Sequence, residues 1–162
     1  MLSDLPLLKP SAFGGVPRVW SRFHDKIMQA KAMPGFSQAL AAKVAMAEKG
    51  IFTKDHDLDR KVFHKFQAIF GGQMRYAATG AAPMSREVLN ALKAVLGCEI
   101  YEGYGQTESC GVATGTLYGG QAGSVGAPLV CNEIKLAAVP DMGYTNIFEK
   151  QKLGEYETSM LF

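Results

Sequence analysis

The sequence predicts an α/β fold in which a partly parallel sheet is flanked by helices. Two strand-like segments, residues 73–78 and the apolar run 98–100, enclose a segment whose apolar residues recur at helical spacing. The order strand, helix, strand indicates two parallel neighbouring strands joined by a right-handed crossover. The carboxyl ends of both strands then meet at one edge of the sheet, where open α/β sheets bind their ligands.

The composition fits one globular domain. The chain has 162 residues, of which 48% are hydrophobic and 20% charged, and its formal net charge is +2; this length is enough to bury a core. The small charge and the lack of a dense Lys/Arg cluster argue against nucleic-acid binding. No apolar run reaches the roughly 18 residues of a membrane-spanning helix, and the first residues do not resemble a secretory signal. The three cysteines, Cys98, Cys110 and Cys131, lack metal-ligand spacing, so we expect reduced thiols in an intracellular protein.

The N-terminal part is expected to form a loop and then two helices. Prolines and glycines punctuate residues 1–15, and Pro17 suits the first turn of a helix. Apolar residues follow at helical spacing: Val16, Val19, Trp20, Phe23, Ile27 and Ala30. Ser37 is the expected N-cap of a second helix over residues 38–49, which Gly50 ends.

Residues 51–58 are polar and are expected to be exposed. His56 stands among three carboxylates, those of Asp55, Asp57 and Asp59. This set suggests either a metal site or a solvated loop. We expect the solvated loop, because clustered charges are usually exposed and no second group of ligands is near in sequence.

The middle of the chain predicts a third helix and the first strand. Residues 59–70 place Val62, Phe63, Phe66, Ile69 and Phe70 on one helical face, and Gly71-Gly72 ends the helix. His64 is expected either at the surface of this helix or satisfied by hydrogen bonds. The strand 73–78 then delivers the chain to Thr79-Gly80-Ala81-Ala82-Pro83, whose small side chains leave room for a ligand beside the backbone.

A fourth helix follows this loop and leads into the second strand. Ser85 is its expected N-cap, and the negative charge of Glu87 in its first turn interacts favourably with the helix dipole. Gly97 is expected to end it. The apolar face consists of Val88, Leu89, Leu92, Val95 and Leu96.

The C-terminal part is small, glycine-rich and compatible with strands. Residues 110–117 predict a strand, and residues 133–139 alternate as another. Between them lie Gly119, Gly120, Gly123 and Gly126. These glycines suggest either a phosphate cradle or turns; we expect turns, since no Lys-Ser/Thr pair follows and no helix opens there.

The stretch Tyr101-Glu-Gly-Tyr-Gly-Gln-Thr-Glu108 holds the residue types most typical of a ligand site, and we expect it to form a loop. Gly103 and Gly105 are expected to adopt positive φ and let the backbone approach a ligand closely. Tyr104, between them, can lay its ring against a flat base.

The end of this stretch indicates phosphate and metal chemistry. The hydroxyl of Thr107 can donate to a phosphate oxygen. Glu108 is repelled by a phosphate unless a cation bridges the two, and Mg²⁺ typically binds through one or two carboxylates plus substrate phosphates. The stretch is therefore either a nucleotide site with magnesium or an ordinary glycine-containing turn.

Taken together, these motifs resemble the adenylate-forming, acyl-activating enzymes. Gly80-Ala81-Ala82-Pro83 matches the family segment that borders the adenine, and Tyr104-Gly105-Gln106-Thr107-Glu108 matches the segment that holds the adenine ring, the α-phosphate and magnesium. Further segments are similar to the long-chain fatty acyl-CoA synthetases, in the same order as in that branch: Lys9-Pro10, Gly15-Val-Pro-Arg-Val-Trp20, Tyr101-Glu-Gly-Tyr104, Gly123-Ser-Val-Gly-Ala-Pro128 and Asn132-Glu-Ile-Lys-Leu136. After Asp141 the family pattern is lost.

The resemblance implies a ligase that converts ATP, a long-chain fatty acid and CoA into acyl-CoA, AMP and pyrophosphate, with Mg²⁺ as cofactor. It implies catalytic roles for Thr107 and Glu108, with Glu108 also binding the magnesium. The nucleotide-binding residues that it implies are Gly80, Ala81, Ala82, Pro83, Glu102, Gly103, Tyr104, Gly105, Gln106 and Thr107. The resemblance also implies that the full-length protein associates with internal membranes. Arg18 and Trp20 suggest either a contact with an acyl chain or membrane, or an amphipathic helix with a packed Trp and a surface Arg; we expect the amphipathic helix.

The same resemblance implies that residues 1–162 are part of the large N-terminal AMP-binding domain. The family's phosphate loop ending in Lys, its ribose-binding Asp and its C-terminal catalytic-lysine domain have no match here, so we expect the isolated chain to be inactive in CoA ligation. One alternative is a non-catalytic nucleotide-binding, acyl-binding or interaction remnant. Another is an acyl-activating enzyme for aryl or amino acid substrates.

Overall fold

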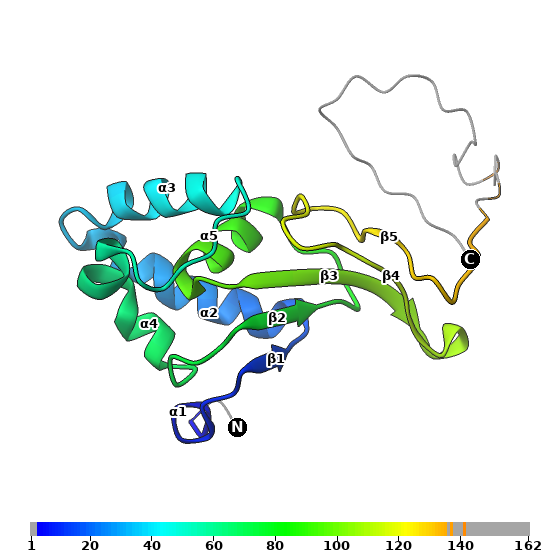
Figure 1. The fold of residues 1–162 in the computed structure, drawn as a ribbon, viewed down its shortest axis with the longest axis horizontal. Coiled ribbons are helices and arrows are strands. Elements are labelled where there is room, and N and C mark those ends of the chain that lie inside the picture. The colour runs from blue at the N-terminus through cyan, green and yellow to red at the C-terminus, as the bar shows by residue number, and fades with distance from the viewer. Residues whose placement is uncertain (1–2, 136, 138–140, 142–162) are drawn as a thin grey trace.

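A five-stranded sheet with the order β1-β2-β3-β4-β5 organises the chain in the computed structural model, which describes residues 3–135, 137 and 141 (Figure 1). The strands are β1 (Ala12–Gly14), β2 (Tyr76–Thr79), β3 (Glu99–Gln106), β4 (Gly111–Gly115) and β5 (Ala127–Pro128). The first three strands are parallel, and β4 and β5 continue the sheet in antiparallel pairs. The predicted α/β fold with a partly parallel sheet is confirmed.

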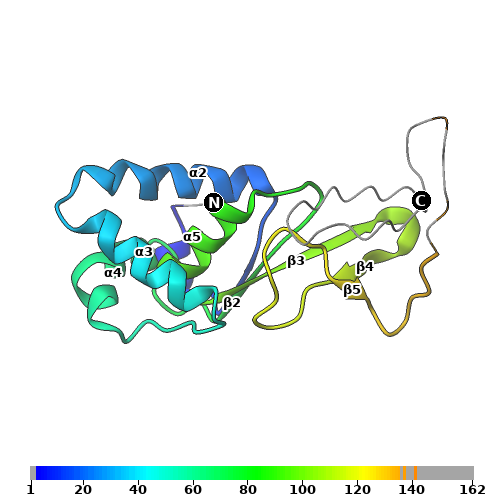
Figure 2. The ribbon, with the colours of Figure 1, turned by 90° about the horizontal axis from the view of Figure 1, so that it is seen from above.

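Helices α2 (Pro17–Gln29) and α5 (Arg86–Leu96) lie on one face of this sheet, as Figures 1 and 2 show. Helices α3 (Phe36–Ala47) and α4 (His64–Ala68) pack against α5. The burial of β2 agrees with this arrangement, because Ala77 and Thr79 are buried whereas Tyr76 and Ala78 are exposed. The hydrophobic core fills the space between the sheet and the helices.

The predicted strand–helix–strand unit is confirmed as β2–α5–β3. Tyr76 pairs with Glu99 and Thr79 with Glu102 in the parallel register. Helix α5 begins at the predicted cap, where the hydroxyl of Ser85 accepts a hydrogen bond from the N–H of Val88. The two strands therefore end at the same edge of the sheet.

Residues 1–15 were expected to be a loop, and this prediction is wrong. A short helix α1 (Leu5–Leu8) precedes strand β1, which pairs in parallel with β2. A strand of three residues ending in glycine carries too little alternation to stand out in the sequence, and its pairing with β2 defines it. The helix predicted after Pro17 is confirmed as α2.

Trp20 of α2 is fully buried, as expected for a packed tryptophan, while Arg18 is exposed. The indole N–H of Trp20 lies 2.9 Å from the carbonyl oxygen of Gly15 and 3.2 Å from that of Ala78. These contacts join the start of α2 to the end of β2.

Helix α3 and the segment after it differ in detail from expectation. The N-cap of α3 is Gly35, with φ of 76°, and not the predicted Ser37, which lies within the first turn. The third predicted helix begins with a π-helical turn, η2 (Asp59–Phe63), before α4. His64 is exposed, as expected.

Asp59 was expected in a solvated loop, and this prediction is wrong. Asp55, His56 and Asp57 are exposed, but Asp59 is 1% exposed and its Oδ2 lies 2.8 Å from Nζ of the buried Lys43. A buried cation supplies the partner that local sequence does not reveal. Within the described part of the chain, no group of three or more metal-ligating side chains gathers, at this segment or elsewhere.

The motif of residues 101–106 was expected in a loop, but it forms the last six residues of β3. Strand β4 pairs with it in antiparallel fashion, and the register shifts between Tyr104 and Gly105. Neither Gly103 nor Gly105 is among the residues with positive φ, so the predicted reason for these glycines is also wrong. They instead allow neighbouring backbone to approach closely.

The remaining C-terminal predictions are confirmed in part. The strand predicted over residues 110–117 is β4, and the glycine-rich segment after it forms turns. Residues 133–135 form no strand, and the rest of the strand predicted for 133–139 lies largely outside the described residues. Cys98 is a buried free thiol, and Cys110 and Cys131 are exposed free thiols. None of the helices in the described ranges has the length and hydropathy needed to cross a membrane.

Candidate functional site

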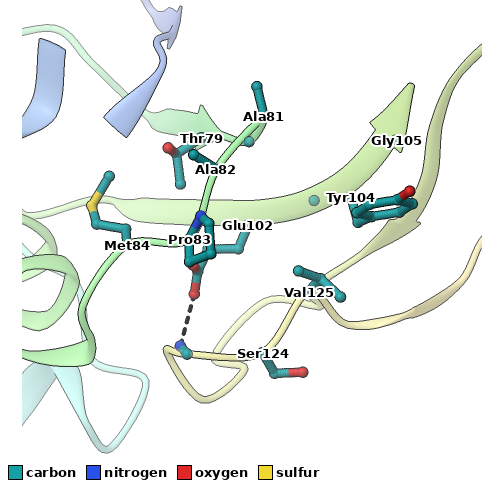
Figure 3. Close-up of a pocket in the computed structure, with 13 residues that line it drawn as sticks. Thr79, Ala81, Ala82, Pro83, Met84, Glu102, Tyr104, Gly105, Ser124 and Val125 are labelled. Atoms are coloured by element: carbon teal, nitrogen blue, oxygen red, sulfur yellow. Dashed lines mark hydrogen bonds between the residues drawn. The ribbon is translucent and has the colours of Figure 1, made fainter. Parts of the chain in front are cut away.

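A cavity of about 300 Å³ opens where β2 and β3 lead into their loops (Figure 3). Three chain segments enclose it. Its lining consists of Thr79, Gly80, Ala81, Ala82, Pro83, Met84, Glu102, Gly103, Tyr104, Gly105, Gly123, Ser124 and Val125. The cavity therefore combines the two sequence motifs with a third segment, 123–125, for which turns were expected and no binding role was predicted.

The first wall is the loop that follows β2. Gly80 packs closely on β3: a Cβ at this position would lie 2.9 Å from the carbonyl oxygen of Gly103. Ala81 has φ of 69°, a left-handed conformation that costs a non-glycine residue roughly 1–2 kcal/mol. Strained backbone of this kind gathers at ligand sites, where the surrounding structure enforces it.

The second wall is the strand β3. Glu102 and Tyr104 are two residues apart, so they share the face of β3 that borders the cavity. Figure 3 shows the ring of Tyr104 beside Val125, on the opposite side of the cavity from Thr79 and Met84. The ring and the small side chains of the opposite loop leave a space suited to a flat group.

Glu102 lies at the floor of the cavity and is only 8% exposed. Its Oε2 accepts a hydrogen bond from the backbone N–H of Gly123, at 2.8 Å. Burial raises the pKa of this carboxyl group, and the hydrogen bond from Gly123 partly offsets the rise. Independently of this shift, the ionised carboxylate of Glu102 repels a negatively charged ligand group, whereas it does not repel an uncharged one.

The third wall, Gly123 to Val125, was missed as part of the site. Gly123 in this segment has φ of 88°, and Gly126, directly after it, has φ of 79°. The sequence signals are the spacing of glycines around Ser124 and the similarity of Gly123–Pro128 to the long-chain fatty acyl-CoA synthetases, and neither separates a cavity wall from an ordinary turn.

A second hollow, of about 750 Å³, adjoins the first along β3. It shares Thr79–Ala81 and Glu102–Gly105 with the first and adds Gln106 and Thr107. Glu108 lies in the 3-10 turn η3 (Thr107–Ser109), is exposed, and lines neither hollow. The predicted metal ligand is thus next to the phosphate-binding candidate Thr107 but outside the cavity itself.

Thr79 has an unusual hydroxyl group. The residue is 6% exposed and lines both hollows. Among the described residues, its Oγ1 is the buried side-chain polar atom without a hydrogen-bond partner. Buried polar atoms are nearly always paired, so a ligand or an ordered water is the expected partner.

The structure brings most of the predicted nucleotide-binding residues together. Around the first cavity lie Gly80, Ala81, Ala82, Pro83, Glu102, Gly103, Tyr104 and Gly105. Gln106 and Thr107 border the second hollow, and both are exposed. Met84 and the segment 123–125 are additional lining residues without a predicted role, and Thr79 was predicted to be part of the ligand-facing loop but not to contact the nucleotide.

Comparison with protein families gives one match that covers nearly the whole chain. The model of the family described as AMP-binding enzyme matches residues 1–155. Among curated proteins, long-chain-fatty-acid–CoA ligase 1 of Homo sapiens is 44% identical over 149 residues, which are 89% of this chain and 21% of the ligase. The peroxisomal long chain acyl-CoA synthetase 6 of Arabidopsis thaliana is 35% identical over 161 residues, 96% of this chain and 23% of the synthetase. The chain thus spans about one fifth of the length of these relatives.

Solved structures show the same partial correspondence. The adenylation domain of a carboxylate reductase from Mycobacterium chelonae aligns with a TM-score of 0.56 and 26% identity, over 91% of this chain and 20% of that one. The A-PCP didomain of a carboxylic acid reductase from Segniliparus rugosus, solved in complex with AMP, gives a TM-score of 0.54 and 27% identity, over 91% and 17%. The fold described above is therefore part of the fold of adenylation domains.

Proposed function

This chain belongs to the AMP-binding enzyme family, and from that premise we propose that it forms part of the adenylate-binding region of a long-chain fatty acid–CoA ligase. The reaction is the condensation of a fatty acid with CoA, driven by cleavage of ATP to AMP and pyrophosphate. The observation that carries the proposal is the cavity between the loop Gly80–Pro83 and the ring of Tyr104.

Three properties of this cavity suit the base of a nucleotide. Its aromatic side chain, Tyr104, offers a face on which a flat base can stack. The unpartnered hydroxyl of Thr79 can donate to or accept from a polar atom on the edge of a base. The buried carboxyl group of Glu102 disfavours an anionic group in the same space. An uncharged, flat and polar-edged group meets all three conditions.

The proposed reaction has two steps. A carboxylate oxygen of the fatty acid attacks the α-phosphorus of ATP, the bond to the β-phosphate oxygen breaks, and pyrophosphate leaves, giving acyl-AMP. The thiolate sulfur of CoA then attacks the acyl carbon, the bond to the AMP oxygen breaks, and acyl-CoA forms. Catalysis of such steps depends on positioning the reactants and neutralising charge.

In this proposal Thr107 donates its hydroxyl hydrogen to an α-phosphate oxygen, and Tyr104 holds the base. Thr107 borders the second hollow, which adjoins the base cavity along β3. The acyl chain and CoA occupy space that residues outside this chain help to form. We also infer, from the resemblance alone, that the complete protein acts at internal membranes.

Glu108 is the proposed magnesium ligand. It is exposed and directly follows Thr107, so a cation beside its carboxylate is close to the proposed phosphate position. One carboxylate would suit Mg²⁺, because this ion typically binds through one or two carboxylates together with substrate phosphates and water. The metal would supply neutralisation of the phosphate charge.

Binding of a hydrolysis-resistant acyl-adenylate analogue to the 162-residue chain tests this function. We expect saturable binding that Tyr104→Ala weakens about tenfold and Tyr104→Phe largely retains, because stacking needs the ring and not the hydroxyl. Thr79→Val tests the hydroxyl at nearly constant side-chain volume and should weaken binding severalfold. No saturable binding, or equal binding by Tyr104→Ala, would contradict the proposed site.

Pyrophosphate release separates ligase chemistry from binding alone. In a polypeptide that carries this segment and releases pyrophosphate from ATP, fatty acid and Mg²⁺, Glu108→Ala should abolish release while leaving the thermal unfolding temperature unchanged. Retained release would remove Glu108 from the metal role. Analogue binding by a protein that never releases pyrophosphate would assign it the non-catalytic binding role.

A further inference from the structure

Strand β3 carries two buried carboxylates that both bind the glycine-rich segment 119–125, referred to below as the wall segment. Glu99 is 2% exposed, and its Oε2 accepts a hydrogen bond from the N–H of Gly119 at 2.8 Å. Glu102 is 8% exposed, and its Oε2 accepts one from the N–H of Gly123, also at 2.8 Å. The two carboxylates therefore bind the wall segment by hydrogen bonds at two positions, Gly119 and Gly123, four residues apart.

Additional contacts fix the chain at the start of this segment and balance the charge. The N–H of Thr116 donates to the carbonyl oxygen of Glu102, and the N–H of Glu102 donates to Oγ1 of Thr116, both at 2.9 Å. Nζ of Lys93, on α5, lies 2.5 Å from Oε1 of Glu99 and 3.4 Å from the carbonyl oxygen of Gly120. Lys93 is itself 4% exposed, so the Lys93–Glu99 pair is fully enclosed.

Buried carboxylates in these positions have a physical reason. The wall segment forms turns, so its backbone N–H groups lack the partners that a strand or helix supplies. Gly119 and Gly123 are exposed, whereas the carboxylates that accept from them are buried and must themselves be paired. Hydrogen bonds to an ionised acceptor are about twice as strong as those between neutral groups. Glu99 and Glu102 thus provide strong acceptors where the sheet provides none.

We propose that Glu99 and Glu102 are positioning residues that hold the wall segment against β3 and so set the side of the cavity formed by Ser124 and Val125. The carboxylate of Glu102 acts on the ligand through Gly123 and does not bind the nucleotide itself, which differs from the role implied by family resemblance. The expected effect of Glu99 and Glu102 on ligand affinity rests on the proposed function, whereas their expected effect on the position of the wall segment does not.

Amide hydrogen exchange in the 162-residue chain tests the hydrogen bond between Glu102 and Gly123 without any ligand. Glu102→Ala should speed exchange at the Gly123 amide about tenfold or more, while Glu102→Gln, whose amide oxygen still accepts, should stay within a few fold of wild type. The Leu92 amide in α5 should not change, because the loss is local. Equal exchange at Gly123 in Glu102→Ala and wild type, or equal acceleration by Gln and Ala, would overturn the proposal.

A matched pair of double variants tests Glu99 without leaving Lys93 unpaired. Lys93→Met with Glu99→Ala should speed exchange at Gly119, and Lys93→Met with Glu99→Gln should restore most of the protection. This pair still decides the question if Glu102→Ala does not fold. Unchanged exchange at Gly119 in the first double variant would remove Glu99 from the positioning role.

Affinity for the acyl-adenylate analogue tests the link to the cavity. Lys93 and Glu99 line neither hollow, yet the Met/Ala double variant should weaken analogue binding severalfold and the Met/Gln variant should retain it. Faster exchange with unchanged affinity would overturn the link between the wall segment and binding. If wild type binds no analogue, the proposed function fails, and the exchange results alone decide the positioning role.

Discussion

Gly105 of β3 and Gly111 of β4 approach so closely that a Cβ at Gly105 would lie 1.9 Å from the carbonyl oxygen of Gly111. The contact falls where the β3–β4 register shifts, next to Tyr104. Gly105 is therefore required by the approach of a neighbouring strand and not by positive φ. The hairpin built on this contact carries Thr107 and Glu108 in its turn.

Gly105→Ala should lower the free energy of unfolding by roughly 1–3 kcal/mol, because the methyl group forces the two strands apart. Gly115→Ala is the matched control in the same hairpin, since its Cβ would meet only Leu129 Cδ2 at 3.7 Å, an ordinary contact. Urea unfolding of both variants measures the difference. Equal stability of the two variants would contradict the close approach.

The buried pair Lys43–Asp59 should respond strongly to removal of one partner. Asp59 Oδ1 also accepts a hydrogen bond from Nε2 of Gln67 at 2.8 Å, so both oxygens of its carboxylate have a partner. Asp59→Ala leaves Lys43 buried without its counter-ion and should cost roughly 3–5 kcal/mol of unfolding free energy. Lys43→Met combined with Asp59→Leu should recover most of that loss.

The exposed Asp57→Ala serves as the control for this experiment and should change the unfolding free energy by less than about 0.5 kcal/mol. A loss for Asp59→Ala as small as that for Asp57→Ala would show that the pair is not buried as described.

Ala81→Gly should stabilise the chain by up to about 1 kcal/mol, because glycine adopts the left-handed conformation of this residue without steric cost. Ala82→Gly, one residue on and outside the positive-φ set, should instead destabilise by roughly 0.4–1 kcal/mol through the entropy of the unfolded chain. Thermal unfolding of the two variants compares them directly. The same sign for both would contradict the strain at Ala81.

Cys98 makes stability depend on pH in the alkaline range. Burial raises the pKa of its thiol from 9.0 to about 11. The protonated thiol is thus favoured in the folded chain, so this contribution is complete below pH 9 and is lost as the pH rises from 9 to about 11. Cys98→Ala should flatten that part of the stability profile measured by urea unfolding, and an unchanged slope would contradict the raised pKa.

Local sequence patterns were sufficient to predict the strand–helix–strand unit that carries the first two walls of the cavity. The cap at Ser85, the helical stripe of α5 and the apolar runs beside it predicted the β2–α5–β3 unit, and with it the meeting of both motifs at one edge of the sheet. These signals are short-range, because a cap and a helical period depend on residues within a few positions of one another.

The features that were missed depend on partners distant in sequence. Strand β1 exists through its pairing with β2, and Asp59 is buried because Lys43 lies in another helix. The wall segment joins the cavity through hydrogen bonds to Glu99 and Glu102, about 20 residues earlier. No local pattern encodes such contacts, so composition alone assigned these residues to a loop, a solvated cluster and turns.

Mapping of AMP binding by amide chemical shifts in the 162-residue chain tests most directly whether the cavity beside Tyr104 binds a nucleotide. We expect saturating AMP to shift the amides of Gly80, Gly103 and Gly105, which line the cavity beside Tyr104. We expect no shift in the groove between α3 and α5, which is lined in part by Leu40 and Asn90. Shifts confined to that groove, or no shifts at saturating AMP, would contradict a nucleotide site in this cavity.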